Sequence, residues 1–148
     1  MEKIAVFVND ADYAQHLLQP MLRGGGPTHW VLVGCAPVLT RHIGRWVSQA
    51  ARRQWRERWA AELFAALEPG FSAQPGSQVE TLLAGRPLIQ VTAKLEARLN
   101  NLRLLDARRP RLGAVDEPIT AAQPGATGAY AGPVAAATGL ALMLALAD

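Results

Sequence analysis

Short apolar runs alternate with longer amphipathic stretches over the first 106 residues of the chain. The runs cover residues 4–8, 30–33, 78–84 and 102–105. They have the lengths of β-strands, and the first two show no alternation of apolar and polar side chains. Because a strand that is apolar on both sides must be covered on both faces, this pattern favours a parallel sheet packed between helices.

Helices are predicted in the connections between these strands. The first covers residues 13–23, with Asp12 as its N-cap and the glycines at 24–26 as its end. The last covers about 87–100 and begins at Pro87, since proline is tolerated in a first helical turn.

The longest amphipathic stretch predicts a helix over about 41–67. Thr40 is its expected N-cap, residues 68–70 (Glu-Pro-Gly) are its expected end, and a loop is expected over 71–77. Its apolar stripe, which we expect to face the sheet, consists of Val47, Ala51, Trp55, Trp59 and Leu63.

This order of elements predicts an α/β fold, a Rossmann-like open parallel sheet flanked by helices, over residues 1–113. Residues 114–148 are expected to form an irregular linker and an atypical apolar C-terminal segment at 134–147. That segment is shorter than the ~20 residues of a membrane-spanning helix. We therefore expect it to pack on the same domain or on a partner subunit, which would make the protein a homodimer without membrane contact.

The amino-acid composition says more about the cellular compartment of the protein than about its function. The single cysteine excludes an internal disulfide and fits a reducing compartment. The apolar run at 4–8 is too short for a secretory signal, so a cytoplasmic location is expected. The formal net charge of +3 is too small to indicate nucleic acid by itself.

Candidate binding residues gather where the predicted strands end, because ligands of open parallel sheets bind beyond the carboxyl ends of the strands. They are Asn9, Asp10, Cys35, Gly85, Arg86, Asp106, Arg108, Arg109 and Gly113. Asp10 suits ribose hydroxyls or a metal, and the arginines match phosphate geometry. The residues at this edge thus predict a small phosphorylated ligand. In the alternative interpretation, Asp10 and Asp12 cap the first helix and the arginines are solvated.

The remaining candidates for chemistry are weaker. Cys35 is either a nucleophile beside Arg41 and His42 or, as we prefer, buried packing. The three histidines have no zinc-ligand spacing, and the chain contains no P-loop, GxGxxG or GxSxG sequence.

Arginines on the long helix raise a further alternative. Arg41, Arg45, Arg52 and Arg56 share one side of that helix, and tryptophans are interleaved with them. This arrangement is typical of nucleic-acid surfaces. Because Trp55 and Trp59 fall on the apolar stripe, we interpret them as core residues and the arginines as a solvated face.

Three segments resemble the universal stress protein family: residues 4–10, residues 83–89 and residues 102–106. The resemblance covers residues 3 to about 113, most of the chain, and implies a Rossmann-like domain. ATP-binding members of that family carry a glycine-rich motif after the fourth strand. Here arginines and a proline stand at 108–111, and only Gly113 with the following alanine is similar to that motif.

The resemblance therefore implies a stress-protein-like domain without tight ATP binding. Because the sequence shows no catalytic constellation, we expect a non-enzymatic binding or regulatory domain that needs no cofactor. The first alternative is a small enzyme or nucleotide-binding protein that uses the strand ends. The second is an arginine-rich adaptor that binds nucleic acid through the long helix.

Overall fold

A computed structural model describes residues 1–37, 47–85, 87–110 and 117–121. Its elements, in chain order, are β1 (Glu2–Val8), α1 (Ala11–Gly24), β2 (Thr28–Gly34), α3 (Gln49–Ser72), β3 (Gln78–Leu83), α4 (Leu88–Arg98) and β4 (Leu102–Asp106). The four strands and three helices expected within residues 1–106 are all present.

The four strands form one parallel sheet in the order β3-β2-β1-β4. In the middle of the sheet, Val6 of β1 lies opposite Leu32 of β2 on one side and Leu105 of β4 on the other. All residues of β1 from Ile4 to Val8 are buried. The prediction of a Rossmann-like parallel sheet that is covered on both faces is therefore confirmed.

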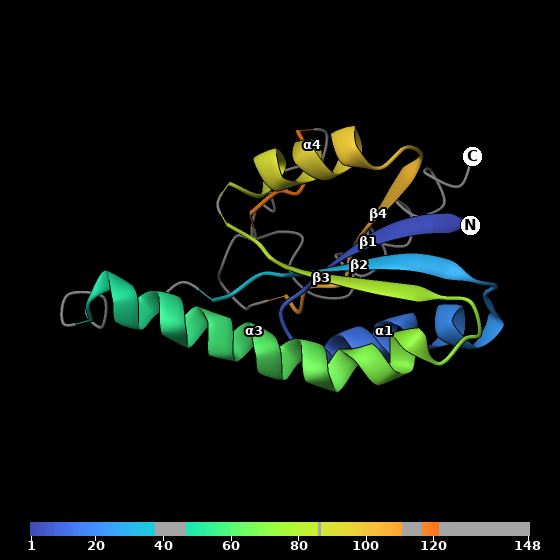
Figure 1. The fold of residues 1–148 in the computed structure, drawn as a ribbon, viewed down its shortest axis with the longest axis horizontal. Coiled ribbons are helices and arrows are strands. Elements are labelled where there is room, and N and C mark those ends of the chain that lie inside the picture. The colour runs from blue at the N-terminus through green and yellow to red at the C-terminus, as the bar shows by residue number, and fades with distance from the viewer. Residues whose placement is uncertain (38–46, 86, 111–116, 122–148) are drawn as a thin grey trace.

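The helices form one layer on each face of the sheet (Figure 1). On one face, α1 and α3 cover the core side chains of β1 and β2, and the ring of Phe71 meets that of Trp30 edge to face at 4.9 Å between centroids. On the other face, α4 covers Phe7 and Val33, and Ile119 joins this second core cluster.

The first helix begins two residues earlier than expected. Its N-cap is Asp10, whose Oδ1 accepts a hydrogen bond of 3.0 Å from the Tyr13 amide, and Asp12 stands within the first turn. Asp10 has the extended backbone that a cap requires, because it follows directly on β1. The prediction of Asp12 as the cap is wrong, and the alternative interpretation of Asp10 is confirmed.

The long helix is shifted toward the C-terminus relative to its prediction. Ser48 is its N-cap and accepts a 3.1 Å hydrogen bond from the Ala51 amide, so the helix cannot be continuous from residue 41. Thr40 lies outside the described residues. The helix also continues past Pro69 to Ser72, because Phe71 in its last turn is buried against the sheet. That burial outweighs the hydrogen bond lost at the proline.

The expected apolar stripe of α3 is correct only at its C-terminal end. Leu63 is buried and Trp59 packs against the core, but the Trp55 side chain is 38% exposed, Ala51 is exposed and Val47 precedes the helix. The reason is length: 24 residues of α-helix measure about 36 Å, whereas a seven-residue strand measures about 23 Å. The first half of α3 therefore extends beyond the carboxyl edge of the sheet (Figure 1).

The predicted apolar segment at 134–147 lies outside the described residues, so its packing, the domain boundary at 113 and the homodimer remain predictions. Among the residues that the structure does describe, none of the helices has the length and apolar character needed to cross a membrane.

Candidate functional site

The strand order reverses its direction between β1 and β4, so the topological switch point of the sheet lies between these two strands. The chain passes from β1 to β2 and β3 in one direction across the sheet and then returns to β4 on the other side of β1. At such a point the helices that follow the strands leave toward opposite faces, and ligands of open α/β sheets bind in the crevice between them.

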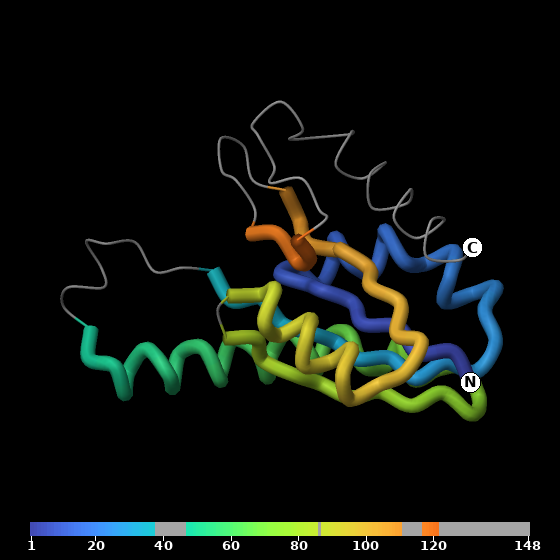
Figure 2. The backbone as a smooth tube through the Cα atoms, turned by 90° about the horizontal axis from the view of Figure 1, so that it is seen from above, coloured from blue at the N-terminus to red at the C-terminus, as the bar shows by residue number. Residues whose placement is uncertain are grey.

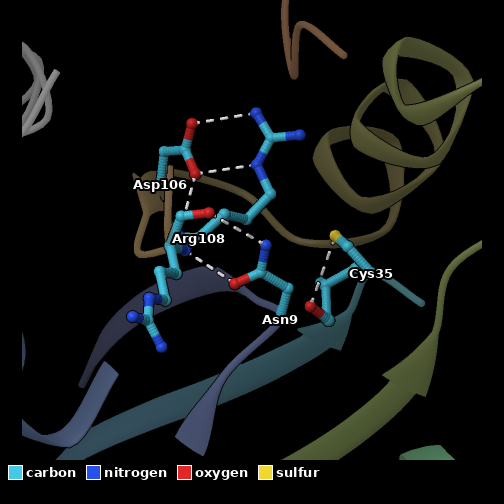
Figure 3. Close-up of polar contacts among 6 residues, drawn as sticks. Asn9, Cys35, Asp106 and Arg108 are labelled. Carbon is cyan, nitrogen blue, oxygen red and sulfur yellow. Dashed lines mark hydrogen bonds and ion pairs between the residues drawn. The ribbon is translucent and has the colours of Figure 1, made fainter. Parts of the chain in front are cut away.

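Five of the candidate residues meet at this switch point. Asn9 and Asp10 follow β1, and Asp106, Arg108 and Arg109 stand at the end of β4. The two strands stay paired to their ends, since the amide of Ala107 donates a 2.9 Å hydrogen bond to the carbonyl of Phe7. Figure 3 shows the Asn9 side chain directed toward the loop that carries Arg108.

The Asn9 side chain joins the two loops through a pair of hydrogen bonds. Its Oδ1 accepts from the Arg109 amide at 2.6 Å, and its Nδ2 donates to the Arg109 carbonyl at 3.3 Å. The amide group of Asn9 thus acts as a clamp between residues 100 positions apart in sequence.

Arg108 and Asp106 form the most buried charge pair at this edge. Nε and Nη2 of Arg108 each donate to a different oxygen of Asp106 at 2.9 Å, and the Arg108 amide donates to the same carboxylate at 3.2 Å (Figure 3). The two side chains are 5% and 18% exposed. Bidentate geometry of this kind is the strongest that arginine forms with a carboxylate, and it neutralises the Arg108 charge within the chain.

Each of the two carboxylate oxygens of Asp10 has a partner. Its Oδ1 accepts from the Tyr13 amide, and its Oδ2 lies 3.4 Å from Nη1 of Arg109, whose side chain is largely exposed. The Tyr13 amide lowers the pKa of Asp10 and Arg109 lowers it further, against the opposing effect of burial. Asp10 is therefore a carboxylate at neutral pH, and it occupies the N-terminus of α1.

A carboxylate also accepts a hydrogen bond at the N-terminus of α4, and it belongs to a residue that the sequence analysis did not identify as a candidate. The N-cap of α4 is Pro87, which offers no side-chain acceptor. Instead, Oε1 of Glu117 accepts a hydrogen bond of 3.2 Å from the amide of Leu88. Ile119, which is 1% exposed, anchors this segment in the core below α4 (orange in Figure 2).

The other candidates lie farther along the edge or outside the described residues. Cys35 extends β2 by one hydrogen bond, from its amide to the carbonyl of Val8 at 2.8 Å, and its half-buried thiol donates to the carbonyl of Val33 at 3.7 Å. Gly85 is exposed after β3, two strands away from β1. Arg86 and Gly113 are outside the described residues.

The arginine-bearing helix also contributes to this edge of the sheet. Nη2 of Arg56 donates a 2.9 Å hydrogen bond to the carbonyl of Ala84, just beyond the end of β3. The sequence placed Arg56 on a solvated face, and its pattern gives no signal for this contact. Across the described ranges, no three side chains of histidine, cysteine, aspartate or glutamate gather into a metal-binding group.

These features define an α/β domain with a Rossmann-like sheet and a charge-compensated switch point. Comparisons of the chain with protein-family models, with curated proteins and with solved structures give no match. The family resemblance therefore stays a prediction, and the function must be argued from the site itself.

Proposed function

We propose that this protein is a non-enzymatic binding or regulatory domain, similar to universal stress proteins, that does not bind ATP tightly. One observation carries the proposal: the chain's own carboxylates occupy the N-termini of α1 and α4, the helices on opposite faces of the sheet. Asp10 holds the first turn of α1, and Glu117 holds the first turn of α4.

Helix N-termini are the places where Rossmann-like proteins bind phosphate, because free amides and the helix dipole favour negative charge there. In this protein each of the two positions already has a negative group. A triphosphate at either position would have to displace a hydrogen-bonded carboxylate or lie beside it, and like charges at contact distance repel.

Two arginines at the carboxyl edge of the sheet also have partners within the chain. Arg108 is paired with Asp106 through two hydrogen bonds, and Arg109 is directed to Asp10. Pro110 follows at the position where a glycine-rich loop would let backbone amides approach phosphate closely. Of the arginines that the sequence offered to a phosphorylated ligand, the two that the structure describes, Arg108 and Arg109, thus have partners within the chain.

The same pairing supports the non-enzymatic part of the proposal. A general acid or base works best with a pKa near the operating pH, which for a carboxyl group requires an upward shift. The pKa of Asp10 is lowered instead, first of all by the Tyr13 amide. Both oxygens of Asp106 accept hydrogen bonds from Arg108, so this carboxylate is engaged with a partner inside the chain.

Calorimetric titration of the full chain with ATP tests the proposal. We expect no binding in the micromolar range, and micromolar affinity would contradict it. In the double variant Asp10→Asn/Glu117→Gln, both helix N-termini keep an oxygen acceptor but lose their negative charge. If the carboxylates exclude phosphate, nucleotide affinity should rise in this variant. It should stay unchanged in Glu62→Gln/Glu96→Gln, which removes two exposed charges elsewhere.

A further inference from the structure

The first half of α3, residues 49–58, has no buried side chain, whereas Trp59 packs against the core and Ala60, Leu63, Leu67 and Phe71 are all buried. This half, which we call the overhang, extends past the carboxyl edge of the sheet in both views of the backbone (Figures 1 and 2). Two complete turns and more of a regular helix are thus presented at the surface.

The overhang is strongly basic. Four arginines fall within seven residues, accompanied by one acidic residue, Glu57; they are Arg52, Arg53, Arg56 and Arg58. Within the part of the chain that the structure describes, Arg53, Arg56 and Arg58 form no ion pair with a carboxylate. Arg56 contacts a neutral carbonyl, so its charge is not cancelled. The overhang therefore keeps its net positive charge.

The positive charges of these arginines do not stabilise the helix. Cations near a helix N-terminus are unfavourable because they oppose the helix dipole, and acidic residues are favoured there. The first turn of α3 contains no acidic residue, and arginines follow directly at 52 and 53. A helix that only needed to be soluble would carry acidic residues in its first turns, so the arginines point to an anionic partner.

Trp55 adds an aromatic surface to this charge. Its side chain is 38% exposed, and the spacing of three residues places it next to the exposed Arg58. A large exposed ring beside an exposed guanidinium group is an arrangement on which a nucleobase stacks while the cation contacts a phosphate.

We propose that the overhang binds single-stranded nucleic acid, with phosphates held by the arginines and a base stacked on Trp55. The charge alone would equally attract an acidic protein surface. The exposed ring favours nucleic acid, because every base has a flat face to stack and an acidic peptide has none. This inference does not depend on the proposal about ATP, because it uses a different surface.

Fluorescence anisotropy of a labelled 20-nucleotide poly-uridine RNA, titrated with the full chain, tests the charge contribution. We expect micromolar binding at low salt that weakens as salt rises. Arg53→Gln/Arg58→Gln should weaken it and lower the slope of log affinity against log salt by about 1.4, the value for two lost phosphate contacts on a single strand. The matched control Arg23→Gln/Lys94→Gln removes two exposed charges from other helices. It should change neither the affinity for the RNA nor the slope against salt.

The stacking contribution is tested by two substitutions of one residue. Trp55→Leu keeps an apolar side chain but loses the ring, and it should weaken binding roughly tenfold. Trp55→Phe keeps a ring and should retain most of the affinity. Because none of the side chains of residues 49–58 is buried, all these variants should melt at the wild-type temperature, which a thermal scan verifies.

Four results would overturn the proposal. The first is a failure of the wild-type chain to bind the RNA at low salt. The second is equal weakening by the overhang variant and by its charge-matched control. The third is unchanged affinity in Trp55→Leu, and the fourth is full displacement of the RNA by polyglutamate at the same charge concentration. Either of the last two results would favour an acidic protein partner instead.

Discussion

The two halves of α3 are built from the same kind of sequence but are held by different forces. In the second half, Leu63, Leu67 and Phe71 are buried against the sheet, so packing holds the helix. In the first half nothing is buried, and the helix depends on the Ser48 cap and on residues with high helix propensity. The length of the sheet, and not the sequence pattern, sets the boundary between the two halves.

This difference shows that an amphipathic stripe in the sequence indicates which side chains of a helix could be buried. Whether they are buried depends on how far the sheet extends beneath the helix. Trp55 and Trp59 stand four residues apart on the same stripe, yet only Trp59 reaches the core. Substitutions in the second half should therefore change stability, and substitutions in the first half should change binding. The predictions below test that division.

The largest effect is expected at Phe71 in the packed half. Its side chain is 1% exposed and meets Trp30 edge to face. Phe71→Ala should lower the free energy of unfolding by about 3–5 kcal/mol, as large core truncations do. Urea unfolding followed by tryptophan fluorescence measures it. A loss below 1 kcal/mol would mean that the last turn of α3, beyond Pro69, contributes little.

A smaller effect, about 1 kcal/mol, is expected from Asp10→Ala, which removes the cap of α1. The pKa of Asp10 is lowered by the Tyr13 amide, and that of Glu80 by its ion pair with Arg98. For a lowered pKa, the stabilisation is present above the unfolded-state value and is lost as pH falls through the folded-state value. Unfolding between pH 7 and pH 2 should show this loss below about pH 4, and less of it in Asp10→Asn/Glu80→Gln.

The sequence predicted the element order, the parallel sheet and most of the strand-end residues, because these follow from local runs and from the topology that such runs allow. It did not predict the contact between Glu117 and Leu88, since no periodic pattern joins two residues 29 positions apart. It also chose Asp12 over Asp10 as a cap, because either residue type fits and only the end of β1 decides between them.

Ser48→Ala should affect the overhang alone. The substitution removes the hydrogen bond to the Ala51 amide and should fray the first turn of α3. Since residues 49–51 of this turn are exposed, the free energy of global unfolding should change by only a few tenths of a kcal/mol. Amide hydrogen exchange should nevertheless be faster at residues 50–54. A large drop in melting temperature would show that the overhang is coupled to the core.

The smallest effect on stability is expected at Trp55, although it is one of the largest side chains in the protein. Exposed substitutions away from caps and pairs usually change stability by less than about 0.5 kcal/mol. Trp55→Ala should remain within that range in the same urea experiment that detects Phe71→Ala. The matched comparison is Trp59→Ala, which removes a ring packed against the core four residues later and should cost clearly more. Equal losses at the two positions would mean that both halves of α3 are packed in solution, and the division between a packed half and a binding half would then be wrong.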